Sequence, residues 1–219
     1  MNVTTNNYHS YIESNGKPSI MPVTPPVIFL DRDGVINEDS SEFIKTREEF
    51  HFIPGSVEAI KRLTQNGFSC IVITNQSMIH RKISTLSHLM DMNQWMISHV
   101  QANGGHIHDI FFCPHGPDSG CECRKPKTGL IEKAASVYSI DISQTIMVGD
   151  NLKDLQCSNR AGCAYTVLVR TGKGKKTESL INNTVTVDFI GDCLLDTVQW
   201  IIHKKGHNIK GENSRSIRF

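Results

Sequence analysis

The sequence predicts an α/β fold with a mainly parallel sheet that helices cover on both faces. Short, wholly apolar runs alternate with longer segments whose apolar residues recur at helical spacing, and this alternation repeats at least four times. An apolar run of this kind is typical of a strand buried on both faces. Successive strand–helix–strand units form right-handed crossovers between parallel strands, so the alternation predicts a doubly wound sheet.

The first predicted strand covers residues 27–30, and Pro54 and Gly55 then introduce a helix that Gly67 ends. The later elements are a strand at 70–73, a helix at about 83–100, a strand at 109–112, a helix at 130–138, a strand at 146–148, a helix at 152–159, a strand at 165–169 and a last helix at 190–203. Ligands of such sheets bind beyond the carboxyl ends of the strands. The residues directly after each strand are therefore candidates for chemistry.

Composition limits the classes of partner. Lys plus Arg is 23 and Asp plus Glu is 22, so a net charge of +1 offers no field that attracts nucleic acid or an anionic membrane. No secretory signal or membrane-length apolar run is visible. Seven cysteines, three of them clustered, argue against a disulfide framework. We expect a cytoplasmic monomer with neither nucleic acid nor membrane as partner.

Three regions are expected along the 219 residues, a length that suits one sizeable domain. Residues 1–25 are polar, end in two prolines, and predict a flexible leader. Residues 26–203 contain all the predicted strands and helices. Residues 204–219 predict a solvated basic tail.

Polar residues directly after the strands predict phosphoryl chemistry. Asp31 and Asp33 follow the first strand, Thr74 follows the second, and Asp150 follows the strand at 146–148. Carboxylates gathered at one crevice repel each other unless a cation lies among them, and oxygen ligands near a phosphate favour Mg²⁺. One carboxylate can attack a phosphoryl group while a second protonates the leaving oxygen, with Thr74 and Lys125 stabilising the charge. The alternative is that these aspartates only form turns and helix caps.

A cysteine-rich loop predicts a structural zinc site. Cys113, His115, Cys121 and Cys123 supply three thiols and one imidazole, the right types and number for a closed tetrahedral Zn²⁺ site. A closed site has no open position, so the ion would be structural. Incidental clustering is the alternative, and a redox pair is disfavoured because no Cys-x-x-Cys is present.

The residues from Phe29 to Asn37, with Thr74-Asn75 and Gly149-Asp150, resemble the haloacid dehalogenase superfamily of phosphohydrolases, in its histidinol-phosphatase-like branch. The resemblance implies a Rossmann-like sheet. It implies that Asp31 is the nucleophile, that Asp33 is the general acid/base, and that Asp31, Asp150 and the backbone carbonyl of Asp33 bind Mg²⁺. The short connections after the first two strands leave no room for a large cap domain.

The loop Cys-x-His…Cys-x-Cys-Arg-Lys-Pro is similar to that of the zinc-containing phosphatases in this branch. The similarity implies that Lys125 stabilises the phosphoryl group. It also implies substrate contacts from Asp39, Asn75, Gln76, Ser77, Arg81 and Arg124, with Asn151 and Asp154 in supporting positions. Asp154 is equally typical of a first-turn helix carboxylate. Members usually carry glycine at the positions of Met78 and Lys82, where φ > 0 or a close approach is expected.

The leading expectation is a Mg²⁺-dependent phosphatase that removes the 7-phosphate of D-glycero-D-manno-heptose 1,7-bisphosphate through an aspartyl-phosphate. This reaction serves nucleotide-activated heptose and surface-polysaccharide synthesis. Histidinol phosphate or another small phosphate ester is the alternative substrate. From another class, a zinc-stabilised binding protein without activity would explain Met78 and Lys82, but leaves the intact Asp31, Asp33 and Asp150 unexplained.

Overall fold

The computed structural model describes residues 23–205. Residues 1–22 of the predicted leader and 206–219 of the predicted tail therefore lie outside the described residues. Lys204, the first residue of the predicted tail, is part of the last helix, and its ammonium lies 5.1 Å from the centre of the Trp200 ring.

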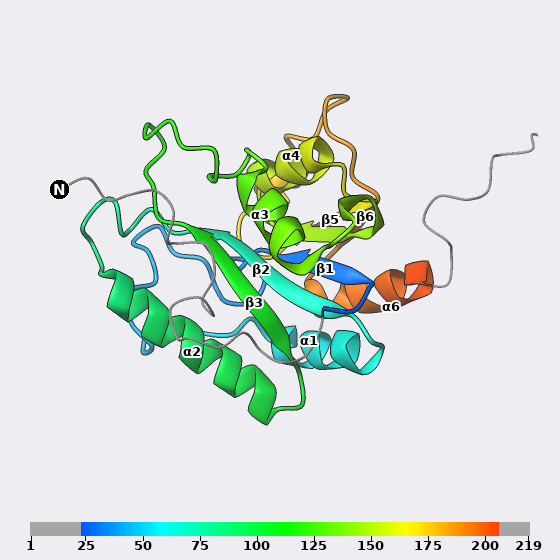
Figure 1. Ribbon diagram of the computed structural model, residues 1–219, viewed down its shortest axis with the longest axis horizontal. Helices are drawn as coiled ribbons and strands as arrows, with labels where there is room; N and C mark the ends of the chain where they lie inside the picture. The colour runs from blue at the N-terminus through cyan, green and yellow to red at the C-terminus, as the bar shows by residue number, and fades with distance from the viewer. Residues whose placement is uncertain (1–22, 206–219) are drawn as a thin grey trace, which may run out of the picture.

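The predicted parallel sheet is confirmed, and it has six strands in the order β3-β2-β1-β4-β5-β6 (Figure 1). The strands are β1 (Val27–Leu30), β2 (Ser69–Asn75), β3 (Ile107–Cys113), β4 (Ile146–Gly149), β5 (Tyr165–Val169) and β6 (Phe189–Gly191). Every neighbouring pair is parallel. From β1 the strands are added outward on one side as β2 and β3, and then on the other side as β4, β5 and β6. The strand order therefore switches between β1 and β4, and at such a switch point a doubly wound sheet forms a ligand crevice.

Helices cover both faces of the sheet (Figure 1). They are α1 (Ser56–Gln65), α2 (Leu86–Ala102), α3 (Gly129–Tyr138), α4 (Leu152–Ala161), α5 (Gly174–Glu178) and α6 (Leu194–Lys205), with a short 3₁₀ helix η1 (Ile142–Gln144). The larger core cluster joins one face of the sheet to α1, α2 and α6, and a second joins the other face to α3 and α4.

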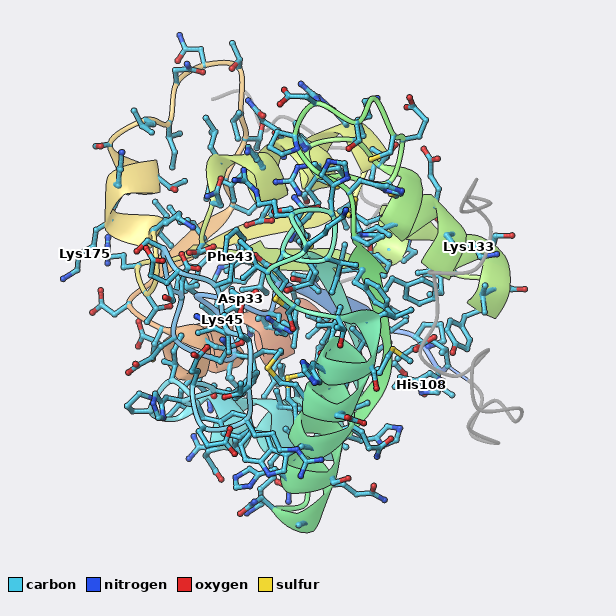
Figure 2. The ribbon with its side chains drawn as sticks, turned by 90° about the vertical axis from the view of Figure 1, so that its left-hand side faces the viewer. Asp33, Phe43, Lys45, His108, Lys133 and Lys175 are labelled. Carbon is cyan, nitrogen blue, oxygen red and sulfur yellow. The ribbon has the colours of Figure 1, made fainter. Side chains whose placement is uncertain are left out.

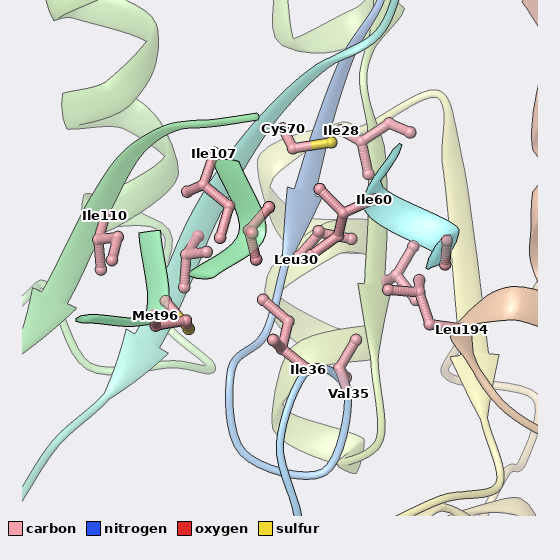
Figure 3. Packing of buried hydrophobic residues seen from close by; sticks show 14 of the residues in the cluster. Ile28, Leu30, Val35, Ile36, Ile60, Cys70, Met96, Ile107, Ile110 and Leu194 are labelled. Atoms are coloured by element: carbon pink, nitrogen blue, oxygen red, sulfur yellow. The ribbon is translucent and has the colours of Figure 1, made fainter. Parts of the chain in front are cut away.

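Alternate side chains of β1 point to opposite faces and feed both clusters. Ile28 and Leu30 belong to the cluster that includes Ile60 of α1, Met96 of α2 and Leu194 of α6, and Ile60 lies beside Leu30 (Figure 3). Val27 and Phe29 pack toward α3. Each of these side chains is almost completely buried, and burial of a large apolar side chain contributes about 1.5–3 kcal/mol. This two-sided burial holds the end of β1 rigidly in the centre of the sheet.

Two predicted boundaries were wrong. The last helix does not start at residue 190, because Ile190 pairs with Leu168 in β6 and the helix begins only at Leu194. The residues predicted for the apolar face of this helix, from Leu194 to Ile202, all lie within it, so only its start was wrong. The helix predicted from residue 83 begins at Leu86, because the Thr85 hydroxyl caps it by accepting from the backbone N–H of His88.

No large cap domain is present in the part of the chain that the structure describes, as predicted. The connections at 31–55 and 76–85 contain turns and isolated bridges but no helix or ladder strand. Between residues 23 and 205, no helix has the length and apolar character that crossing a bilayer requires. The carboxyl edge of the sheet is therefore covered only by loops.

Candidate active site

A cavity of about 280 Å³ opens at the carboxyl ends of β1, β2 and β4. Asp31 enters it from the end of β1, Thr74 from β2 and Asp150 from the end of β4. Lys125 reaches the same cavity from the cysteine-rich loop. The structure thus brings together Asp31, Thr74 and Asp150 from the ends of three strands, as parallel strands require, and adds Lys125 from a loop.

The carboxylate of Asp31 is only 8% exposed and accepts two short hydrogen bonds. The Nζ of Lys125 donates to its Oδ1 at 2.8 Å, and the backbone N–H of Arg32 donates to the same oxygen at 2.7 Å. Burial and the nearby Asp154 raise the pKa of Asp31 to about 7, although Lys125 pulls in the other direction. The Asp31 carboxylate is therefore held in place, but Lys125 compensates its negative charge only in part.

Lys125 is 2% exposed and uses its ammonium fully. Nζ contacts Asp31 at 2.8 Å, Asp154 at 2.6 Å and the carbonyl oxygen of Ile73 at 2.7 Å. An ammonium has three donors, so all three are satisfied. Burial opposes its charge, but the two carboxylates outweigh burial and raise the pKa of Lys125, so it is a fixed cation. Asn75 holds its backbone by donating to the carbonyl oxygen and accepting from the N–H.

Asp150 lies at the start of the loop before α4. Its Oδ2 accepts from the backbone N–H of Lys173 at 2.7 Å. A Cβ at Gly34 or Gly172 would collide with the Asp150 carboxylate, and both glycines have positive φ, so these positions demand glycine. Burial, Asp154 and Asp31 raise the pKa of Asp150 to about 8.

Asp154 and Asn151, predicted as supporting residues, form a capping box at the start of α4. The Asn151 side chain accepts from the backbone N–H of Lys153, and the Asp154 side chain accepts from the backbone N–H of Asn151. The other oxygen of Asp154 binds Lys125. Asp154 thus has both the capping role and the supporting role that the sequence left open.

Asp33 lines the cavity, but its carboxylate turns toward Arg32. Arg32, Asn37 and Gln76 all donate to it, at distances of 2.7–3.2 Å. Although burial favours the neutral form, the charge of Arg32 and these hydrogen bonds lower the pKa of Asp33. The two aspartates of one motif therefore have pKa values moved in opposite directions.

The acidic cluster has the donor set of a hard divalent cation. Asp31, Asp150 and Asp154 each offer a carboxylate oxygen, and these oxygens lie within 4.8 Å of one another. Three carboxylates face one ammonium, that of Lys125, and burial together with this excess of negative charge raises the pKa values of Asp31 and Asp150. Oxygen donors around a divalent ion relieve such an excess, so the residues fit Mg²⁺.

The four predicted zinc ligands come together in the loop after β3. Cys113 Sγ lies 3.2 Å from Cys123 Sγ and 3.7 Å from Cys121 Sγ, and His115 Nδ1 lies 3.2 Å from Cys123 Sγ. Tetrahedral Zn²⁺ with Zn–S bonds of about 2.3 Å places its ligand atoms roughly 3.5–3.8 Å apart. The sulfur and nitrogen donors thus already have nearly the spacing of such a site.

Of the six predicted substrate contacts, five line the cavity, namely Asp39, Asn75, Gln76, Ser77 and Arg124. Arg81 does not line it, and its guanidinium lies 5.8 Å from the ring centre of Phe43, which does. In Figure 2, Asp33 and Phe43 lie close to each other and far from His108 near the start of β3.

Sequence reasoning missed three cations that line the cavity, Arg32, Lys153 and Lys173. Lys173 forms an ion pair with Asp39 across the mouth. It follows β5 by a few residues, so the rule that ligands lie beyond strand ends could have found it. Lys153 lies in the first turn of α4, between two residues that were predicted.

The two residues that replace family glycines behave differently. Lys82 has φ 56°, the left-handed region that glycine occupies freely and other residues at a cost of about 1–2 kcal/mol. Met78 has no positive φ; it is fully buried in the larger core cluster. The expected strain is present at one position only, and neither change alters the cavity-lining carboxylates.

Comparison with known proteins places the chain among phosphatases. Residues 122–197 match a family model described as HAD-hydrolase-like. The D-glycero-β-D-manno-heptose-1,7-bisphosphate 7-phosphatase of Neisseria meningitidis is 42% identical over 81% of this chain and 95% of its own length. The enzyme of the same name from Pseudomonas aeruginosa is 46% identical over 69% of this chain and 84% of its own length. The chain belongs to this family of heptose-bisphosphate phosphatases. It is thus a phosphoric monoester hydrolase by family, as the sequence predicted.

Solved structures agree in fold with the chain. The heptose 1,7-bisphosphate phosphatase from B. bronchiseptica, complexed with magnesium and phosphate, is 38% identical, with a TM-score of 0.77 over 81% of this chain and 98% of that one. The heptose 1,7-bisphosphate phosphatase from Burkholderia thailandensis is 33% identical, with a TM-score of 0.62 over 80% of this chain and 97% of that one. These likenesses cover about four fifths of the chain and not one motif.

Proposed function

We propose that this protein hydrolyses the 7-phosphate of D-glycero-D-manno-heptose 1,7-bisphosphate, with Mg²⁺ as its cofactor and an aspartyl-phosphate as its intermediate. The observation that carries the proposal is the pairing of a buried carboxylate, Asp31, with a buried fixed cation, Lys125, at 2.8 Å in the cavity of a heptose-bisphosphatase family member. We further propose that it acts as a cytoplasmic monomer in nucleotide-activated heptose synthesis for surface polysaccharide, without nucleic-acid or membrane partners.

In the first step an oxygen of Asp31 attacks the phosphorus, and the bond from phosphorus to the sugar oxygen breaks. Asp33 gives a proton to the departing oxygen, so the sugar leaves as an alcohol; because its resting pKa is lowered, Asp33 must first take up this proton. In the second step Asp33 takes a proton from water, whose oxygen attacks the aspartyl-phosphate and releases inorganic phosphate. Lys125 and the hydroxyl of Thr74 stabilise the charge on the transferring oxygens.

Asp31, Asp150 and the backbone carbonyl of Asp33 would hold Mg²⁺, with Asp154 behind them. When bound, Mg²⁺ neutralises the carboxylate excess and polarises the phosphoryl group. A fixed ammonium alone leaves this neutralisation incomplete, as the raised pKa of Asp31 indicates.

Cys113, His115, Cys121 and Cys123 would hold structural Zn²⁺. Lys125 follows the last of these ligands by two residues, and Arg124 donates to the carbonyl oxygen of His115 at 3.1 Å. A loop closed by a metal holds its cations in place before substrate arrives, which lowers the cost of ordering them. Thiolate ligands persist in a reducing compartment, in keeping with the cytoplasm.

The test is phosphate release in Mg²⁺ from both anomers of the heptose bisphosphate, with histidinol phosphate and fructose 1,6-bisphosphate as comparisons. We expect a large kcat/KM preference for one heptose anomer, and its loss in Asp31→Asn. A preference for histidinol phosphate would favour the alternative substrate. Full activity in Asp31→Asn would refute the nucleophile, and no release from any ester would favour a non-catalytic zinc-stabilised binding protein.

A further inference from the structure

We propose that Asn93, in the middle of α2, is a positioning residue for Asp33 and acts through the buried guanidinium of Arg32. The inference rests on the proposed role of Asp33 as general acid/base and adds a residue that no motif contains. Asn93 follows Asp33 by sixty residues, as Arg32 and Asn93 are 61 apart, and only the fold brings them together.

Arg32 is the largest of the fully buried side chains, at 1% exposure. Its Nε lies 3.2 Å from Asp33 Oδ1, and its Nη2 contacts both oxygens of the same carboxylate at 2.9 and 3.1 Å. Such a fork grips a carboxylate in one orientation. Because Arg32 contacts both oxygens, a shift of its guanidinium would shift the Asp33 carboxylate, which Asn37 and Gln76 also hold.

The guanidinium itself is held at its other end. Nη1 donates to Asn93 Oδ1 at 3.3 Å, Nη2 donates to Gln76 Oε1 at 3.2 Å, and the ring centre of Phe50 lies 5.9 Å from the guanidinium carbon. Gln76 also donates to Asp33 and Thr74, so it cannot move independently of the site. Asn93 does not line the cavity, so it holds Nη1 from the side of α2.

Packing does not explain the amide of Asn93. The residue is 0% exposed on the face of α2 that also buries Leu89, Met92 and Met96. Its Nδ2 has no hydrogen-bond partner among the residues that the structure describes. Burying an amide with an unpaired donor costs free energy that an apolar residue of the same size would not. The polar side chain is therefore retained at a cost, and the bond to Arg32 is the interaction it provides.

The consequence follows from geometry. Without the Asn93 oxygen, Nη1 loses its acceptor and the guanidinium can tilt about its contacts with Asp33 and Gln76. Displacement of a catalytic group by about 1 Å costs on the order of 100-fold in rate. The loss should fall on the step that needs Asp33 to deliver a proton, and not on the attack by Asp31.

Two substrates separate these steps. Heptose 1,7-bisphosphate loses a sugar alkoxide, which must be protonated, whereas 4-nitrophenyl phosphate loses a phenolate that is stable without a proton. The comparison uses kcat/KM, since this parameter excludes the later hydrolysis of the aspartyl-phosphate, where Asp33 also acts. A defect in folding or metal binding would lower both values alike.

The variant Asn93→Leu keeps the volume and removes the acceptor. We expect kcat/KM for the heptose bisphosphate to fall roughly 10- to 100-fold, and that for 4-nitrophenyl phosphate to fall by less than about threefold. Asn93→Asp restores an acceptor and should recover most of the sugar-phosphate rate. Gln94→Leu, on the exposed side of the same helix, is the matched control and should leave both substrates unchanged.

Asp33→Asn separates failure of this inference from failure of the proposed function. If Asp33→Asn shows the difference between substrates but Asn93→Leu lowers both rates equally or neither, the positioning role is wrong. If Asp33→Asn itself affects both substrates equally, the general-acid role of Asp33 fails instead. Equal losses in Asn93→Leu and Asn93→Asp would also overturn the proposal, because the second variant retains the acceptor.

Discussion

Raising the pH should destabilise the protein when Mg²⁺ is withheld. The pKa is about 7 for Asp31 and about 8 for Asp150 in the folded chain, against a usual value of 3.8. A carboxyl whose pKa is raised by folding contributes stability that is complete below the unfolded pKa and is lost as the pH rises through the folded pKa. In the unfolded chain both groups are already ionised above pH 6, so the change comes from the folded state.

The expected magnitude follows from these two values. Between pH 6.5 and pH 8 the folded protein still binds a fraction of a proton at each group, while the unfolded chain binds essentially none. Since one pKa unit corresponds to about 1.4 kcal/mol, the free energy of unfolding should fall by about 2 kcal/mol over this interval. Asp150, with the higher pKa, supplies the larger part of the loss.

Urea unfolding at pH 6.5, 7.2 and 8 measures the effect, with zinc retained and Mg²⁺ withheld. Saturating Mg²⁺ should flatten the dependence, because a bound cation keeps the carboxylates ionised at every pH in the series. Asp150→Asn should remove most of the slope in the absence of Mg²⁺. A metal-free stability that is constant or rises from pH 6.5 to pH 8 would refute the account of excess negative charge.

Three further results are expected. Cys123→Ser should lower the zinc content measured by atomic absorption and reduce phosphate release at least tenfold, since Lys125 depends on the loop; an unchanged rate with zinc lost would contradict that dependence. Burial and the neighbouring His106 lower the pKa of His108 to about 4, and unfolding restores its usual value. In saturating Mg²⁺ the free energy of unfolding should therefore fall by about 2–3 kcal/mol from pH 6.5 to pH 4. His108→Phe should remove this loss, and a loss that persists in this variant would contradict the assignment to His108. Lys153 lines the cavity, and we expect it to bind the second phosphate of the substrate. Lys153→Met should then raise KM for the bisphosphate about tenfold and leave the KM of a monophosphate unchanged, and Lys153→Arg should restore the KM for the bisphosphate. Equal effects on both substrates would mean that Lys153 does not bind the second phosphate.

The sheet and the site could be predicted because both follow from local patterns. Wholly apolar runs identified β1, β2, β4 and β5, and the carboxyl ends of parallel strands meet by geometry. The gathering of Asp31, Thr74 and Asp150 needed no more than strand order. The zinc ligands needed only residue type and spacing.

The missed features depend on contacts that the sequence does not display. β6 has three residues, too few for a pattern, and exists because β5 offers it an edge. No sequence pattern predicts that Arg32, between two aspartates, is buried; it is buried because Asp33, Gln76 and Asn93 together satisfy its guanidinium. Its partner on α2 carries no periodic or motif signal at all. Such a network becomes visible only when the helix is packed on the sheet.

The cysteine-rich loop explains how a site without a cap domain obtains its central cation. The ammonium of a lysine on a mobile loop would be solvated by water, whereas Lys125 is held in place through its backbone, its ammonium and the loop before it. Asn75 both donates to and accepts from the backbone of Lys125. The Ile73 carbonyl and two carboxylates bind its ammonium. Cys123, two residues before Lys125, lies in the predicted zinc cluster. In capped enzymes a second domain can close over the substrate and exclude water. Here the same preorganisation has to come from the loop itself, before substrate binds.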